Sequence, residues 1–452
     1  MSRELAGLIV FGVLIAGCGQ PTTRPTKPIA DTDEKPPATA GGAASDQFAL
    51  ENFVVGEPIR FENLTVFPVA SRVPKNDDRF ITLDEGLKAG TVEIHELASG
   101  AVQSMPSANN EPAERKETDP FAEDSEAIEH QAADPDGPDV PQSDFEANDV
   151  NALSLVNRSD KPLYLMPGEV IIGGSQDRTI GCELVIAAHS QPTKVPVFCV
   201  EHGRWGRKGI EDTLVQISNA GASRVLSESV SLSVAPNQSL DQVAQQADGG
   251  KFVATVGHLG KSARLAVQSD KSQAAVWDEV AEPNSKSGVQ PDSGAFTANY
   301  SDAETVKRLE PYLESLQIPV AKQDQVVGVL IAINGKMESI DVFESTPLFR
   351  KVWPKLLKSY TLDAVNATED ATAKPAECTR AAALSFLAEA LHANVASSDS
   401  EHGIGLVKRD GQHVLSFTSH IEPAASPAGM GGMGGGMGGG MGGGVHVSGF
   451  SK

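Results

Sequence analysis

Apolar residues in the first half of the chain fall largely at alternate positions, in short runs that turn-forming residues separate. Leu64–Val69 and Thr91–Leu97 show this alternation, which is typical of strands with one buried face. Ala152–Asn157 and Pro162–Pro167 form another pair of such runs, and the polar residues Arg158–Lys161 between them predict a hairpin turn. The pattern therefore predicts a β-rich half, built of antiparallel hairpins, that ends near residue 205.

The second half changes to apolar positions with helical spacing, interrupted by hairpin signals. We expect helices over the following segments: 239–244, 272–280, 301–316 with a kink or a break at Pro311, 346–360 despite Pro354, and 379–393. The residues from Glu282 to Gly294 are rich in Ser, Gly and Pro and predict a loop. Asn334-Gly335 and Asp410-Gly411 each lie between two apolar runs and predict hairpin turns. Together the two halves predict an α+β fold with a β-rich N-terminal half followed by helix–hairpin–helix elements.

Three segments have a composition that does not predict a folded core. The acidic insert, 106–149, has 14 acidic and 2 basic residues after position 110, and we expect it to be disordered. We likewise expect a disordered tether over 18–48 and a flexible Gly/Met-rich tail over 422–452. Calcium binding by the insert and Cu(I) binding by the tail methionines are the alternative interpretations. The remaining sequence, 49–421, then forms one domain.

The N-terminus and the overall charge indicate where the protein acts. Arg3 is followed by the apolar run Leu5–Ile15 and then by Ala16-Gly17-Cys18. This order resembles a bacterial lipoprotein signal, 1–17, whose Cys18 is lipidated after cleavage; a plain signal peptide or a short membrane anchor is the alternative. We therefore expect an exported protein in the bacterial cell envelope, lipid-anchored to the outer or the cytoplasmic membrane. The formal net charge of −23 argues against binding to a nucleic-acid polymer.

Cys182 and Cys199 lie in two β-branched runs, Thr179–Ala188 and Val195–Val200, that predict a further hairpin. In that hairpin the two cysteines would face each other, at a Cβ separation that is close to what a disulfide needs. The pattern therefore predicts either a bridge or two small apolar residues on one face of the sheet. We expect no metal site, because no CxxC motif or histidine cluster occurs. We also expect no cofactor, because the glycines between 168 and 174 do not form a G-x-G-x-x-G fingerprint and no P-loop motif occurs.

The region Leu165–Trp205 combines glycines, charged residues and apolar runs more densely than any other part of the chain. Glycine lets a ligand approach the backbone, and arginine suits bidentate binding of phosphate or carboxylate. The candidate ligand-site residues are Glu169, Gln176, Asp177, Arg178, Glu201, His202, Arg204 and Trp205. Alternatively, the same residues form a structural polar cluster in which Arg178 pairs with a neighbouring carboxylate.

A resemblance to a known family rests on motifs that occur in order along the chain. They are Pro58-Ile59, Asn63–Pro68, Leu83-Asp84-Glu85, Gly168-Glu169, Gly173, Gln176, Arg178, Val197, Cys199, Glu201, Gly203-Arg204-Trp205, Gln273, Val276-Trp277 and Asp341-Val342-Phe343. This set resembles the ARPP domain, the "ARG and Rhodanese-Phosphatase-superfamily-associated Protein" domain, over roughly 49–420. By association only, the family name implies a nucleotide-like or ADP-ribose-type ligand. It implies no catalytic role for any residue.

Three functions are consistent with the sequence. The first is a lipid-anchored module that binds a nucleotide-like small molecule or another envelope protein. The second is a hydrolase of a phosphorylated or ADP-ribosylated substrate, with Glu169, Glu201 or His202 as acid or base. The third is a purely structural envelope lipoprotein. A pocket that encloses Glu169, Arg178 and Glu201 would favour the first two, and direct pairing of these groups would favour the third.

Overall fold

The computed structural model describes residues 47–97, 151–201, 231–232, 240–248, 250–289, 294–367, 377–401, 403–422 and 443–452. The predicted signal peptide over 1–17, Cys18, the predicted acidic insert, and residues 423–442 of the Gly/Met-rich segment lie outside the described residues. Helices and antiparallel sheets alternate along the described chain, and the first half is rich in strands, so the α+β prediction is confirmed. No helix within the described ranges is long and apolar enough to cross a bilayer.

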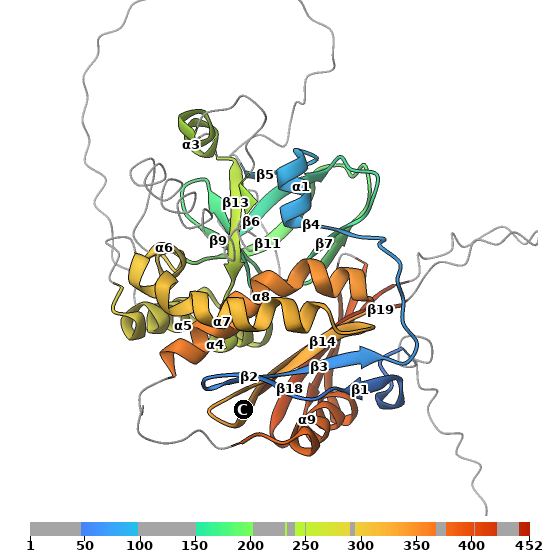
Figure 1. Cartoon of the computed structure of the whole chain (residues 1–452). Coiled ribbons are helices and arrows are strands. Elements are labelled where there is room, and N and C mark those ends of the chain that lie inside the picture. Colours follow the sequence, from blue (N-terminus) through green and yellow to red (C-terminus); the bar gives the residue numbers. More distant parts are fainter. Residues whose placement is uncertain are drawn as a thin grey trace, which may run out of the picture. The chain divides into compact units, whose positions relative to one another are not determined.

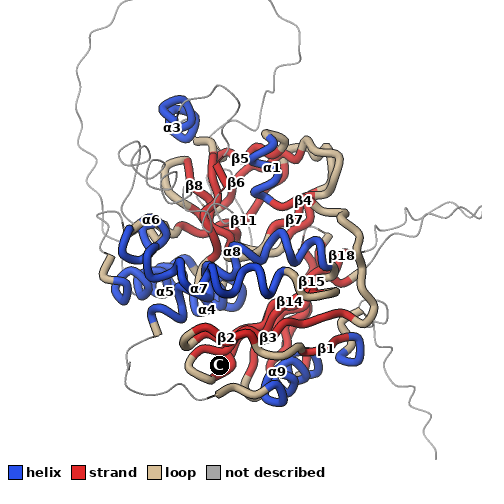
Figure 2. Tube along the Cα trace, in the orientation of Figure 1, coloured by secondary structure: helices blue, strands red, loops and turns tan. Residues whose placement is uncertain are grey.

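The largest sheet combines the beginning of the domain with its C-terminal third. Its described strands run in the order β1-β3-β14-β15-β19-β18-β17-β16, and β2 pairs with β3 (Figures 1 and 2). Their bounds are Phe53–Val55 (β1), Ile59–Phe61 (β2), Leu64–Ser71 (β3), Val326–Ile333 (β14), Lys336–Phe343 (β15), Asn394–Glu401 (β16), Ile404–Asp410 (β17), Val414–Ile421 (β18) and Gly444–Ser451 (β19). The two predicted Asn-Gly and Asp-Gly hairpins are β14–β15 and β17–β18.

A second sheet contains the residues that the sequence singled out. Its described strands run in the order β12-β13-β8-β9-β11-β6-β5, and a small sheet, β10-β7-β4, lies beside it. The bounds are Ile81–Thr82 (β4), Val92–Glu96 (β5), Ala152–Asn157 (β6), Leu163–Leu165 (β7), Glu169–Gly173 (β8), Arg178–Ile180 (β9), Leu184–Ile186 (β10), Thr193–Cys199 (β11), Ser231–Leu232 (β12) and Phe252–His258 (β13). The predicted hairpin of Ala152–Asn157 with Pro162–Pro167 is wrong, because β6 pairs with β5 and β11 whereas β7 pairs with β10 and β4.

Most of the helices lie in a layer between the two large sheets, two others pack against the second sheet, and one packs on the outer face of the largest sheet (Figure 1). The helices are α1 (Leu83–Ala89), α3 (Leu240–Asp248), α4 (Lys261–Leu265), α5 (Gln273–Ser287), α6 (Ala298–Ser301), α7 (Ala303–Ala321), α8 (Thr346–Asn366) and α9 (Arg380–His392), with a 3-10 turn at Leu50–Asn52 and a π turn at Ala266–Asp270. α7 and α8 lie between the sheets in Figure 1, and one apolar core joins them to both. α9 packs on the opposite face of the largest sheet.

The central position of α8 explains its burial. Its side chains are buried on nearly every side, because β13 and β14 both pack against it. Such a helix retains its path through Pro354, since tertiary packing offsets the hydrogen bond that proline removes. Pro311 does not divide its helix, because α7 continues through it as one helix. α5 also continues through Pro283 to Ser287, so the loop predicted from Glu282 is wrong at its start.

The C-terminal residues form a strand, which corrects the prediction of a tail over 422–452. β19 inserts between β15 and β18 and hydrogen-bonds to both along its length. Its apolar residues Val445, Val447 and Phe450 are fully buried. The Gly/Met-rich segment therefore connects two paired strands, and the backbone N–H of Ile421 donates to the carbonyl oxygen of Gly443 at 3.0 Å. The alternation of Val445 and Val447 was the signal for this strand, and the adjoining glycines hid it.

Candidate functional site

The hairpin of β8 and β9 positions most of the candidate residues. Gly173 and Gly174 open its connection with φ values of 140° and 60°, which favour glycine. A Cβ atom on Gly173 would collide with the backbone oxygen of Lys251 on the neighbouring strand. The tight turn therefore requires glycine, and it brings Gln176 and Asp177 into the interior, where both are buried.

Glu169 does not approach the other candidate residues but points to the central helix. Lys355 on α8 donates hydrogen bonds to Glu169 and, at 2.5 Å, to Asp84 of α1. Thr255 on β13 donates to the same Asp84 oxygen at 3.1 Å. Burial raises the pKa of Glu169 to about 7, with Lys355 opposing that shift and Asp84 adding to it. Burial opposes ionisation of Lys355, but Asp84 and Glu169 more than offset it, so the lysine pKa is raised.

Lys358 lies one helical turn further along α8 and has different surroundings. Its Nζ donates to the backbone oxygen of Val256 at 2.9 Å and lies 4.3 Å from the ring centroid of Tyr300. Among the described residues no carboxylate lies within ion-pair distance of this lysine. Burial lowers the pKa of Lys358 to about 7, so much of the protein carries it as a neutral amine at neutral pH.

Arg178 and Gln176 form a buried hydrogen-bonded pair next to the turn. Nη1 of Arg178 donates to the Oε1 atom of Gln176 at 2.9 Å, and both side chains are almost fully buried. Within the described ranges, the Nε atom of Arg178 and the Nε2 atom of Gln176 have no hydrogen-bond partner. No carboxylate in the described part of the chain pairs with Arg178, so the predicted structural pairing with Glu169, Asp177 or Glu201 is wrong.

Asp177 and Glu201 instead join the ends of two strands. The backbone N–H of Asp177 donates to Oε2 of Glu201 at 3.1 Å. Thr297, just before α6, donates from its hydroxyl to Oδ2 of Asp177 at 3.0 Å. These contacts tie the start of β9 to the end of β11 and to the helical layer. The candidate residues His202, Arg204 and Trp205 lie outside the described residues.

The predicted disulfide between Cys182 and Cys199 is wrong. β11 pairs with β9 in a register that places Cys199 opposite Arg178, and no bond joins the two cysteines. The reason is a break in the first run, which divides into β9 and β10, and β10 pairs with β7 instead. The backbone of Cys199 exchanges two hydrogen bonds with the side chain of Gln273, which anchors the start of α5.

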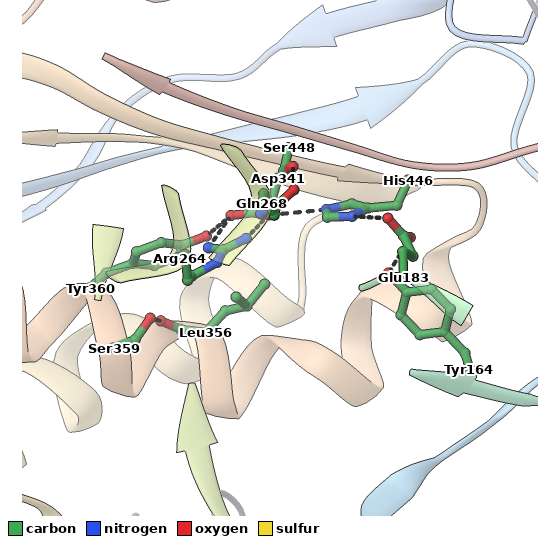
Figure 3. Close-up of polar contacts among 10 residues, drawn as sticks. All are labelled: Tyr164, Glu183, Arg264, Gln268, Asp341, Leu356, Ser359, Tyr360, His446 and Ser448. Atoms are coloured by element: carbon green, nitrogen blue, oxygen red, sulfur yellow. Dashed lines mark hydrogen bonds and ion pairs between the residues drawn. The ribbon is translucent and has the colours of Figure 1, made fainter. Parts of the chain in front are cut away.

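A second buried polar network, which the sequence did not predict, lies between α4, α8 and the largest sheet (Figure 3). Arg264 binds both carboxylate oxygens of Asp341, at 3.0 and 2.6 Å, and Tyr360 donates a hydrogen bond to one of them. His446 lies between Asp341, at 3.0 Å, and Glu183, at 3.4 Å. This network links α4 and α8 to β15 and β19.

The charges in this second network support each other. The two carboxylates oppose the effect of burial and raise the pKa of His446 to about 9, so its ring is an imidazolium at neutral pH. Arg264 and His446 outweigh the effect of burial and hold the pKa of Asp341 well below its ordinary value. Tyr164 completes the network by donating to Glu183 at 2.7 Å. With two cations and two anions, the charges of the network balance, as expected for a structural element, although the Nε atom of Arg264 has no hydrogen-bond partner among the described residues.

Comparison with protein families identifies the domain. The model of the ARG and Rhodanese-Phosphatase-superfamily-associated Protein domain, ARPP-1, matches residues 52–114 and 119–418. A comparison with curated proteins gave no match, and neither did a comparison with solved structures. The matched ranges include Glu169, Arg178, Lys355 and Asp341, whereas β19 and its His446 lie beyond them. Because the match covers most of the chain, the protein belongs to the ARG and Rhodanese-Phosphatase-superfamily-associated Protein domain family.

Proposed function

We propose that this protein is an exported, lipid-anchored module that binds a small anionic ligand through Arg178 and Gln176. The ligand class is a molecule with a phosphate or carboxylate group, and nucleotide-like molecules fall within it. The observation that carries the proposal is the buried guanidinium of Arg178, which has no carboxylate partner in the described part of the chain.

The energetics of this guanidinium support a ligand. A buried charge without a counter-charge costs several kcal/mol, and each buried donor that lacks an acceptor costs about 1–3 kcal/mol. The Nε atom of Arg178 and the Nε2 atom of Gln176 are two such donors. A phosphate or carboxylate would offer oxygen acceptors for such donors and would neutralise the charge, and the guanidinium of arginine is suited to binding such groups.

The contacts of the two candidate catalytic carboxylates support binding over hydrolysis. Glu169 accepts hydrogen bonds from Lys355 in a buried cluster, and Glu201 accepts the backbone N–H of Asp177. A general acid or base must reach the proton that it transfers. Both glutamates are buried and already bonded within the protein, so each has a structural role that accounts for its position.

The test of ligand binding uses the full chain in detergent and isothermal titration with inorganic phosphate, ADP-ribose and glutarate. We expect at least one of these anions to bind, and Arg178→Gln to weaken that binding by at least about tenfold. Arg350→Gln is the matched control, because Arg350 is an exposed arginine on α8 that should leave the affinity unchanged. Absence of binding by all three anions, or equal affinity of Arg178→Gln, would contradict the proposal.

A second substitution at the same residue gives an independent measurement. Because an uncompensated buried charge destabilises the ligand-free protein, Arg178→Met should raise its Tm, whereas a guanidinium that holds the fold together should lower it on removal. Export and anchoring are tested separately. The native protein should incorporate a lipid label and appear in the membrane fraction, and Cys18→Ser should do neither. A Cys18→Ser protein that still carries lipid would contradict the proposed anchor.

A further inference from the structure

A pocket of about 200 Å³ opens between α4, α5 and the C-terminal end of α8, away from Arg178. For scale, a cavity of about 150 Å³ can hold a benzene molecule, so this one has room for several non-hydrogen atoms. Part of its wall is apolar, from Ala263, Pro283 and Ile333. Such a wall favours a ligand with an aliphatic or other apolar body.

The charged groups of this pocket do not balance. Its two lysines each have a glutamate partner: Lys261 with Glu338 at 2.5 Å, and Lys286 with Glu282 at 2.8 Å. Two carboxylates, Glu279 and Asp363, remain without a lysine or arginine partner among the described residues. The described lining therefore carries an excess of negative charge, which a cationic ligand would neutralise.

Asp363 is held in place by the backbone rather than by a cation. Its Oδ2 atom accepts the N–H of Lys261 at 2.9 Å, and a Cβ atom on Gly260 would collide with its other carboxylate oxygen. Burial raises the pKa of Asp363 to about 6, and burial together with Glu282 raises the pKa of Glu279. Both shifts mean that the protein does not fully stabilise these negative charges, whereas a nearby positive charge would do so.

We propose that this pocket binds a small organic cation with an aliphatic body, such as an alkyl diamine, between Glu279 on α5 and Asp363 on α8. The two carboxylates come from different helices and both line the pocket, which suits an ammonium group that donates to both or a diamine that spans them. A metal ion is not supported, because no group of three or more metal-ligating side chains occurs among the described residues. This site is separate from the anion site proposed above.

The test is isothermal titration of the full chain in detergent with 1,5-diaminopentane, and with 1,5-pentanediol as a neutral molecule of the same length. We expect the diamine to bind and the diol to bind at least about tenfold more weakly. Glu279→Gln should weaken diamine binding about tenfold, and Asp363→Asn, which retains an oxygen acceptor for the N–H of Lys261, should do the same.

Glu314→Gln is the matched control, since it removes the same charge from the exposed face of α7 and should leave the affinity unchanged. Diamine affinity should also decrease as the pH falls through about 6, because Asp363 then becomes protonated. Lack of diamine binding, equal binding of diol and diamine, or equal loss in Glu314→Gln would overturn the proposal. Glu279→Gln alone decides the result if Asp363→Asn fails to fold.

Discussion

Replacement of Lys355 by methionine tests the buried charge cluster most directly. Lys355 is the cation that binds both Glu169 and Asp84, and its side chain is only 2 % exposed. Methionine has a similar length but no charge, so the substitution removes the ion pairs without opening a large cavity. The variant therefore leaves one buried and one partly exposed carboxylate without their cation.

The expected loss of stability is large and depends on pH. Removal of one partner from a buried ion pair costs about 3–5 kcal/mol, and this is the loss expected at about pH 8.5. Glu169 has a folded-state pKa of about 7, above its ordinary 4.5, so the folded protein binds its proton more tightly than the unfolded chain does. In the native protein and in Lys355→Met alike, Glu169 therefore contributes most stability below its ordinary pKa, and this contribution is lost as the pH rises through its folded-state pKa.

Without Lys355 the pKa of Glu169 should rise further. Below about pH 7 the carboxyl is protonated in both proteins, and the loss reflects mainly the contact with Asp84. Above pH 7 the carboxyl of Glu169 ionises in the native protein but stays protonated in the variant. Keeping this proton lowers the free energy of unfolding of the variant by about 1.4 kcal/mol per pH unit, relative to the native protein. The difference in free energy of unfolding should thus be about 2 kcal/mol larger at about pH 8.5 than at about pH 6.

Urea unfolding of both proteins, followed by circular dichroism at the two pH values, measures these differences. Addition of Glu169→Gln to Lys355→Met should remove the additional loss at high pH, because no carboxyl remains to be kept protonated. A loss below about 1 kcal/mol at about pH 8.5 would show that the lysine is not needed as a partner. An equal loss at both pH values would refute the assignment of the raised pKa to Glu169.

Two further predictions concern the C-terminal strand. His446 has a folded-state pKa that is raised from 6.5 to about 9. Its stabilising contribution of up to about 3 kcal/mol is therefore complete below pH 6.5 and is lost as the pH rises through 9. Urea unfolding should show this decline in the native protein, and an equal decline in His446→Gln would contradict the prediction. Deletion of residues 443–452 should abolish cooperative thermal unfolding, because it exposes the edges of β15 and β18. Shortening the Gly/Met-rich connection between Glu422 and Gly443 should instead leave the Tm nearly unchanged. A cooperative transition at the native Tm after the deletion would contradict the role of β19.

Local signals in the sequence were sufficient for elements whose geometry is set by neighbouring residues. The Asn334-Gly335 turn has positive φ at both residues, 51° and 78°, which is the conformation that these two residue types favour in hairpins. β16 gave no comparable signal, since its sequence NVASSDSE lacks apolar alternation and is exposed. Its strand conformation depends on hydrogen bonds to β17, so only the pairing defines it.

The buried charge cluster could not be predicted because its members are far apart in the sequence. Lys355 lies 271 residues from Asp84 and 186 residues from Glu169. In a helix, Lys351, Lys355 and Lys358 indicate a face exposed to solvent. Here a sheet covers that face, and the helix buries both Lys355 and Lys358. The turn that places Arg178 was visible in its glycines, but the missing carboxylate partner follows only from the three-dimensional arrangement.

The buried basic residues of the described chain show why Arg178 is the unusual one. Lys355, Arg264 and His446 each have carboxylate partners. Lys358 and His258 have no carboxylate partner among the described residues, but burial lowers the pKa of both, so each can be neutral. An arginine cannot, because its guanidinium stays protonated in proteins. Arg178 is therefore the buried arginine in the described part of the chain that has no carboxylate partner there, and an anion from outside the described residues would neutralise it.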